Sequence, residues 1–138
     1  MIVLDTNVLS ETLRPAPANS VSRWMMAQPS TSLFTTTICE AEIFYGLALM
    51  ARGRRRTRLE EAVAAIFEQD FAGRILPFDS AAARAFAPIA ARRRELGRPI
   101  SECDAQIAAI AHSRGATLAT RNVEDFADCG IEVINPWE

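Results

Sequence analysis

The stretch Ile2-Val3-Leu4-Asp5-Thr6-Asn7 decides the fold prediction, because a short apolar run ends there on an acidic residue. The run Ile2–Leu4 predicts a buried strand, and the polar residues after it predict the start of a helix. Asp5 fits two roles. Aspartate is favoured at helix N-caps, and a carboxylate at the end of a strand is also well placed to bind a metal ion. Both interpretations of Asp5 are open at this point.

Beyond this stretch, short apolar runs alternate with helical patterns along the chain. Strands are expected at residues 2–4, 32–36, 75–78, 117–119 and 132–134. Helices are expected at residues 7–13, 20–28, 38–51, 57–71, 80–96 and 102–114, with a helical turn at 123–126. Asp79 or Ser80 is expected to cap the fifth of these helices, and Gly97 to end it. Short strands separated by helices predict an α/β fold, with a parallel sheet covered by helices on both faces.

The composition excludes several classes of protein. A chain of 138 residues, 49% of them hydrophobic, predicts one folded domain over residues 1–138. No apolar run approaches the roughly 20 residues of a membrane span. No secretory signal is visible at the start, so we expect a cytoplasmic protein without membrane contact. Three cysteines without CxxC spacing predict buried free thiols, and the single His112 makes a zinc site or a Ser-His-Asp triad improbable.

The distribution of charge is more informative than the net charge of −2. All fifteen basic residues are arginine. They form two dense groups: Arg52, Arg54, Arg55, Arg56 and Arg58, and then Arg92, Arg93, Arg94 and Arg98. Each group is either a solvated helix face or a contact for a phosphate backbone, which the planar guanidinium suits.

Glu42 lies where the helical pattern calls for an apolar residue. At about 100° per residue, Glu42 falls within a face that we expect to point into the core, made of Ile38, Ala41, Tyr45, Ala48 and Leu49. Glu40 lies on the opposite side, where it would complete a capping box with Thr37. An unpaired carboxylate on a core-facing stripe costs several kcal/mol, so Glu42 predicts a bound cation.

Asp104 repeats this pattern. It lies at the centre of a second apolar face, made of Cys103, Ile107, Ala108, Ile110 and Ala111, whereas Glu102 points outward. A capping box from Ser101 to Asp104 is the competing explanation. A fourth polar stretch contains Thr120, Asn122 and Asp125, which either cap the turn at 123–126 or support a metal site.

These acids predict one chemistry. In parallel sheets, functional residues gather beyond the carboxyl ends of the strands, which would bring Asp5, Glu42, Asn122 and Asp125 into one cleft. Clustered carboxylates are tolerated mainly when a cation lies between them, and Mg²⁺ or Mn²⁺ prefers such hard oxygen ligands. A metal-activated water that cleaves a phosphodiester, leaving a 5′-phosphate and a 3′-hydroxyl, is the expected reaction.

The chain resembles the PIN-domain ribonucleases, and among them the VapC-type toxins of bacterial type II toxin–antitoxin pairs in the FitB-like branch. The resemblance runs from end to end. It rests on Val3–Glu11, Ala41–Gly46, Gly73–Asp79, Asp104–Ala109, Ala119–Phe126 and Ile134–Trp137, in this order and spacing.

This resemblance implies a three-layer α/β/α sandwich with a five-stranded parallel sheet, RNA cleavage dependent on Mg²⁺ or Mn²⁺, and a homodimer. It also implies a small antitoxin whose tail blocks the acidic cleft, and contact with DNA only through that antitoxin. Asp5, Glu42 and Asp104 match the family's acidic residues, and Thr6 and Thr120 match its supporting hydroxyls. The chain departs from the pattern at Asn122, where some members have Asp and where a second metal would bind; Asp125 is a possible fourth acidic position.

Two other functions compete with the ribonuclease. In the first, the domain binds nucleic acid or antitoxin within a DNA-binding regulatory complex and does not cleave. The three acids argue against this, because a scaffold without catalysis has no need of buried carboxylates. In the second, an aspartyl-phosphate phosphatase or receiver, the expected second Asp after Asp5 and the phosphate-binding lysine are both missing. In the ribonuclease, the group Arg52–Arg58 would contact either RNA or the antitoxin.

Overall fold

The computed structural model describes all 138 residues and contains one five-stranded parallel sheet, as the sequence predicts. Its strands are β1 (Ile2–Leu4), β2 (Leu33–Thr36), β3 (Ile75–Leu76), β4 (Thr117–Ala119) and β5 (Val133–Ile134). They lie in the order β3-β2-β1-β4-β5, and all four neighbouring pairs are parallel. The first strand is therefore central, with β2 on one side and β4 on the other.

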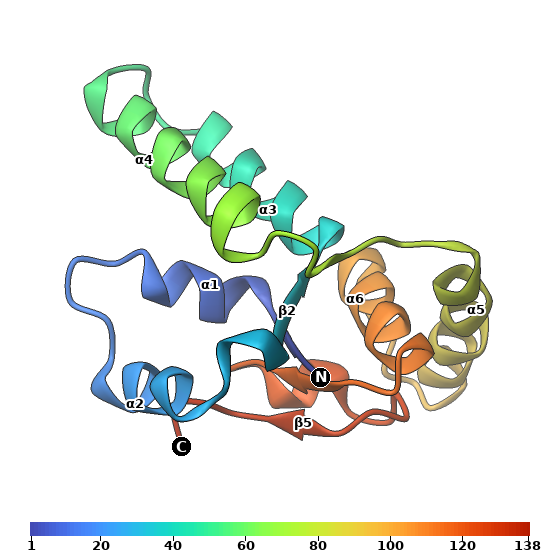
Figure 1. Ribbon diagram of the computed structural model, residues 1–138. Coiled ribbons are helices and arrows are strands. Elements are labelled where there is room, and N and C mark those ends of the chain that lie inside the picture. Colours follow the sequence, from blue (N-terminus) through green and yellow to red (C-terminus); the bar gives the residue numbers. More distant parts are fainter.

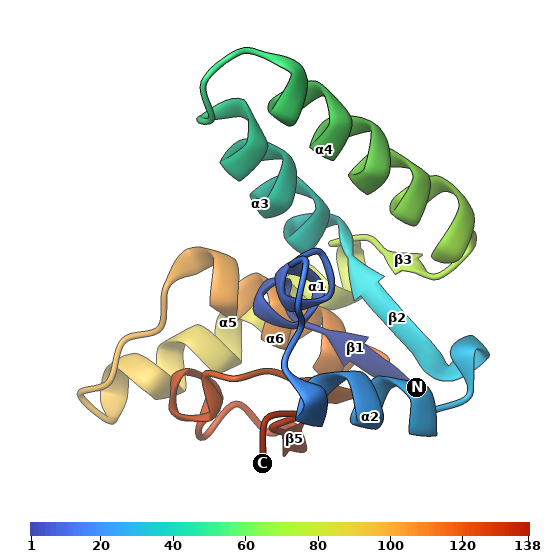
Figure 2. The same ribbon diagram turned by 90° about the vertical axis from the view of Figure 1, so that its left-hand side faces the viewer.

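Helices cover both faces of this sheet, which makes a three-layer α/β/α sandwich (Figure 1). One face carries α1 (Thr6–Thr12) and α2 (Asn19–Ala27), and the other carries α5 (Ser80–Glu95) and α6 (Glu102–Ser113). The pair α3 (Thr37–Ala48) and α4 (Arg54–Ala65) extends away from the end of β2 (Figure 2). The shorter turns are η1 (Ser30–Ser32), η2 (Ile66–Asp70) and η3 (Val123–Phe126). No helix has the length and apolar character needed to cross a membrane.

The core lies where the central strands meet the helices. Val3, Leu4, Leu118 and Ala119 are fully buried, because a sheet covered on both faces buries successive side chains of its central strands. On α6, the buried residues run from Ala105 to Ala111 with only Gln106 more open, so the predicted apolar face is confirmed for Ile107, Ala108, Ile110 and Ala111. Cys103 is exposed, whereas Cys39 and Cys129 are buried. The prediction of buried thiols is therefore wrong for Cys103, which lies in the first turn of α6, before its buried residues begin.

The predicted buried face of α3 is also wrong. The residues that it buries are Cys39, Ile43 and Leu47, and it packs through them against α1 and α4. Tyr45 and Leu49 remain 67% and 69% exposed. The helix is apolar nearly all round, so periodicity alone does not identify the side that is buried.

The helix caps agree with the sequence prediction at α5 and differ from it by one residue at α3. The Asp79 carboxylate accepts a hydrogen bond from the Ala82 backbone N–H at 3.0 Å and caps α5, as expected. The cap of α3 is Thr36, one residue before the predicted Thr37, and its hydroxyl accepts from the Cys39 N–H at 3.1 Å. Glu40 consequently has no capping role.

Candidate metal centre

Asp5 takes the first of the two roles that the sequence left open for it, the N-cap of α1. It is only 5% exposed and caps α1, because its Oδ1 accepts a hydrogen bond from the Thr6 backbone N–H at 2.8 Å. Its Oδ2 accepts from the Thr120 hydroxyl at 2.7 Å and from the Asn7 amide at 3.4 Å. The carboxylate is thus fixed at the junction of β1, α1 and β4.

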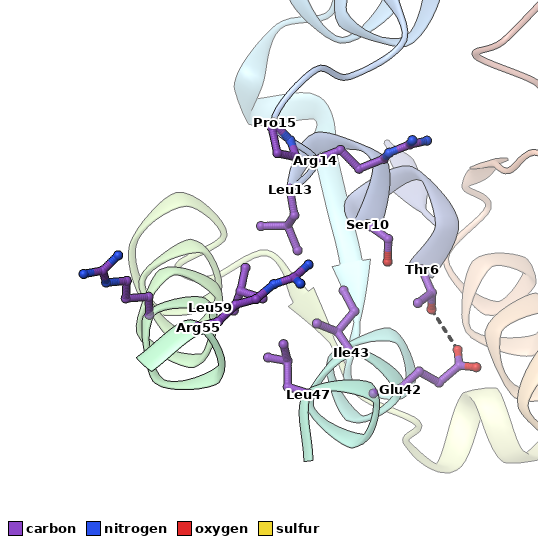
Figure 3. A pocket seen from close by; sticks show the side chains of 12 residues that line it. Thr6, Ser10, Leu13, Arg14, Pro15, Glu42, Ile43, Leu47, Arg55 and Leu59 are labelled. Carbon is purple, nitrogen blue, oxygen red and sulfur yellow. Dashed lines mark hydrogen bonds between the residues drawn. The ribbon is translucent and has the colours of Figure 1, made fainter. Parts of the chain in front are cut away.

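Glu42 faces Asp5 from α3. Its Oε1 accepts a hydrogen bond from the Thr6 hydroxyl at 2.8 Å (Figure 3). Ligand atoms of Asp5, Glu42 and Cys39 lie within 4.8 Å of one another. The Cys39 thiol donates to the Leu4 carbonyl at 3.6 Å, and burial, with the Asp5 charge adding, raises the pKa of this thiol to about 11. The two carboxylates, not the sulfur, are therefore the available ligands.

Asp104 approaches from the first turn of α6. Its backbone N–H donates to the Ser101 hydroxyl at 3.2 Å, so Ser101 caps the helix and forms the first half of the predicted capping box. Burial is the main reason that the pKa of Asp104 is raised, with the charges of Asp125 and Glu42 adding to it. Asp104 lines the same cavity as Asp5 and Glu42.

The pKa of Asp5 is raised by burial and by the neighbouring acids, like that of Asp104. It is raised from 3.8 to about 6, first by burial and then by the charges of Asp104 and Glu42, against the hydrogen bonds from Thr120 and Thr6. No arginine forms an ion pair with Asp5, Glu42 or Asp104. Three carboxylates that form no ion pair with a cationic side chain, two of them bonded to hydroxyl groups, fit a hard divalent cation.

One cavity of about 500 Å³ joins these residues. Its lining comprises Asp5, Thr6, Asn7, Ser10, Glu11, Arg14, Glu42, Asp104, Arg121, Asn122 and Trp137. Thr120 lies behind it, bonded to Asp5 and Asn7. Asp125 is exposed on η3 and does not line the cavity. Asn122 occupies the cap position of η3 without a capping bond from its side chain, so the predicted capping role is wrong and its amide stays available.

Several residues of this cavity are not predicted from the sequence. Ser10 and Glu11 follow Asn7 at helical spacing on α1, and Arg14 continues this spacing just beyond the end of the helix, so the spacing was the available signal. Glu11 is buried and ties down the next loop, because its carboxylate accepts from the Ala18 N–H at 3.1 Å and pairs with Arg14 at 3.4 Å. Trp137 enters from the segment after β5, and no local pattern would have assigned it to the site.

The two arginine groups divide between structural and surface positions. In the first, Arg56 bonds to Glu60 at 2.7 Å, whereas Arg55 and Arg58 line a second cavity of about 740 Å³ that shares Glu42 with the first. In the second, Arg93 is only 5% exposed, so neither a solvated face nor a phosphate contact describes it. Arg98 pairs with exposed acids, Glu124 and Asp128.

Comparison with known proteins agrees with this geometry, because residues 2–131 match the PIN domain. The chain belongs to the PIN domain family. It is 41% identical to the VapC ribonuclease Y4jK of Sinorhizobium fredii over 138 residues, which is 100% of this chain and 99% of that protein. It is 38% identical to toxin FitB of Neisseria gonorrhoeae over 137 residues, covering 99% of each.

A solved structure shows the same PIN domain architecture. The structure of FitAB bound to an IR36 DNA fragment contains a chain with a TM-score of 0.94 and 38% identity, covering 100% of this chain and 96% of that one. The fold that the sequence predicts is thereby confirmed.

Proposed function

We infer that this PIN domain is a VapC-type ribonuclease, the toxin of a toxin–antitoxin pair. The observation that carries this is the convergence of Asp5, Glu42 and Asp104 on one cavity with no cationic side chain paired to any of them. Relatives that align over the full chain and are named VapC ribonuclease and toxin support it. A domain that only binds is less well supported, since uncompensated acids would lower its stability and serve no purpose there.

We propose Mg²⁺ or Mn²⁺ as the cofactor, held by Asp5, Glu42 and Asp104. Bound there, the cation would supply a water of lowered pKa and offset negative charge on the phosphate. The chain's own contribution is positioning. The hydroxyl groups of Thr6 and Thr120 donate to Glu42 and Asp5, which orients both carboxylates before RNA arrives. Asn122 can add only a neutral amide oxygen where an Asp would add charge, so this set favours one tightly held metal.

The direct test compares Asp104→Asn with Glu102→Gln, because both acids lie in the first turn of α6 and only Asp104 lines the cavity. Asp104→Asn is expected to slow RNA cleavage by at least about 10²-fold, since one ligand is lost. Glu102→Gln is expected to cleave at the wild-type rate. The measurement is cleavage of total and tRNA-enriched RNA in Mg²⁺, Mn²⁺ and EDTA, with the ends mapped for 5′-phosphate and 3′-hydroxyl. Equal activity of Asp104→Asn and wild type would refute the site.

The second cavity supports the proposed antitoxin partner. Leu13, Ile43, Leu47 and Leu59 form an apolar floor between α1, α3 and α4 (Figure 3). Arg14, Arg55 and Arg58 add positive charge around it, and Glu42 connects it to the acidic cavity. A peptide with apolar and acidic side chains fits this groove, and its end would reach the metal ligands. We therefore assign Arg55 and Arg58 to antitoxin contact, whereas Arg52 and Arg54 stay available to RNA. DNA contact would come only through the antitoxin, and the pair would act in the cytoplasm.

We also propose that the domain is a homodimer that pairs through α3. Tyr45 and Leu49 lie one turn apart on the exposed side of this helix, next to the small residues Ala41 and Ala48. Two exposed large apolar side chains side by side form the kind of patch that a second subunit covers.

Tyr45→Arg is expected to convert this dimer into a monomer, because a charge at the centre of an apolar interface would lose its hydration without gaining a partner. Met26→Arg is the matched control, since Met26 is 86% exposed on α2, away from α3. Light scattering coupled to size exclusion gives both masses. A Tyr45→Arg protein that stays dimeric would contradict the assignment of α3.

A further inference from the structure

The segment after β5 brings an aromatic side chain into the acidic cavity. β5 ends at Ile134, and Pro136 after it is buried. The side-chain oxygen of Asn135 accepts a hydrogen bond from the Trp137 N–H at 2.9 Å. The backbone carbonyl of Asn135 accepts one from the Glu138 N–H at 3.2 Å. These two bonds fix the segment in a turn. Trp137 is held half-buried, on the same cavity wall as Asn122.

Arg121 lies against this tryptophan. Its guanidinium carbon is 5.1 Å from the centre of the Trp137 ring, within the range of a cation–π contact. Its backbone N–H donates to the Asn7 side-chain oxygen at 3.2 Å, which anchors the loop after β4 to α1. The side chain is exposed and forms no ion pair, although it lines the same cavity as three acids. The Trp137 ring thus holds the Arg121 guanidinium in the cavity that contains the three carboxylates, and Arg121 forms an ion pair with none of them.

We propose that Arg121 and Trp137 form a nucleotide subsite, in which the guanidinium plane supported by the indole stacks on an RNA base next to the scissile phosphate. The inference rests on the proposed ribonuclease function and adds a substrate contact to it. Bases of single-stranded RNA stack on aromatic rings and on arginine planes, and an arginine already stacked on a tryptophan is ordered in advance. Because stacking uses the face of the base, the subsite tolerates all four bases.

The chain allows a direct optical test, because it has two tryptophans, Trp24 and Trp137. Trp24 lies on α2, so Trp24→Phe leaves Trp137 as the only indole. In an Asp104→Asn background, where RNA is bound without being cut, a single-stranded eight-nucleotide oligouridylate is titrated in Mg²⁺. The anisotropy of a label on the RNA reports binding, and indole fluorescence reports stacking. We expect quenching in Trp24→Phe and none in Trp137→Phe, where Trp24 alone emits.

Substitution of Arg121 separates stacking from charge. Arg121→Ala is expected to weaken binding of the oligonucleotide about 5- to 150-fold, the usual effect of removing one stacking contact. Arg121→Lys keeps the charge without the plane and is expected to lose most of the same affinity. Binding of an abasic ribose-phosphate chain of equal length should change little in Arg121→Lys and leave the fluorescence of Trp137 unchanged.

The outcomes distinguish this subsite from the function on which it rests. RNA binding with unchanged Trp137 fluorescence overturns the subsite and leaves the ribonuclease intact. Equal losses of base-containing and abasic RNA in Arg121→Ala, with full rescue by lysine, would make Arg121 a phosphate contact only and also overturn it. If no RNA binds to any form of the folded protein, the ribonuclease function fails, and the subsite fails with it.

Discussion

Asp5→Asn is expected to abolish RNA cleavage and at the same time to stabilise the metal-free protein at pH 8. Loss of a central metal ligand is expected to slow cleavage by about 10³-fold or more. The N-cap survives, because the asparagine side-chain oxygen can still accept the bond from the Thr6 N–H that Asp5 accepts at 2.8 Å. The substitution therefore removes a charge and leaves the start of α1 in place.

The stability change follows from the pKa of Asp5, which burial raises from 3.8 to about 6. The folded state binds this proton more tightly than the unfolded state, so the contribution of Asp5 to stability is greatest below about pH 4. It falls as the pH rises through 6, by about 3 kcal/mol in total. Asparagine does not ionise, so the free energy of unfolding of Asp5→Asn does not fall in this way as the pH rises.

Urea unfolding in EDTA at pH 5 and pH 8 measures the part of this loss that occurs above pH 5, roughly half of it. Glu61→Gln is the control, because Glu61 is exposed on α4 and unpaired. In saturating Mn²⁺, the wild type should become more stable than Asp5→Asn, because only the wild type is stabilised by binding the metal. The gain is about 2.7 kcal/mol at one hundred times the Kd. If the metal-free stability of the wild type rose between pH 5 and pH 8, the claim that burial raises the pKa of Asp5 would be contradicted.

Arg93→Met is expected to lower the free energy of unfolding by about 3–5 kcal/mol, the largest effect we expect outside the acidic site. The buried guanidinium donates to three backbone carbonyls: Arg98 at 2.7 Å, Asp125 at 2.7 Å and Ala127 at 3.1 Å. Methionine fills similar space but leaves these carbonyls without a donor. Two of them belong to η3 and the residue after it, so the substitution also releases the segment that carries Asp125.

Arg92→Met is the matched control, because Arg92 is the exposed neighbour of Arg93 on α5 and should change stability by less than about 0.5 kcal/mol. Urea unfolding gives both values, and hydrogen exchange over residues 122–129 reports the release of η3. If the two variants were equally stable, the guanidinium of Arg93 would have no structural role.

Parts of this architecture were predictable because they depend on short-range patterns. The strand before Asp5 and the helix after Ser101 follow from apolar runs and caps, and parallel topology then places strand ends together. The buried face of α3 was not predictable, because large hydrophobic residues lie on both sides of the helix, and only the position of α1 and α4 decides which side is covered.

The roles of Arg93 and Trp137 depend on tertiary contacts. Arg93 stands in a group of arginines that looks solvated, and only the folding of η3 against α5 supplies carbonyls for it. Trp137 is distant in sequence from every acid of the site, and it reaches the cavity because β5 is paired in parallel with β4.

The hydrogen bond from Thr120 to Asp5 joins residues 115 positions apart, and β4 is one of the two strands that flank β1. During synthesis, Asp5 is therefore translated long before Thr120, whose hydroxyl donates to it. At about 5–20 residues per second, that interval lasts roughly 6–23 s on the ribosome. A nascent chain of this topology cannot complete the Asp5–Thr120 contact until β4 has been translated and has paired with β1, and a chain that ends before β4 never completes it.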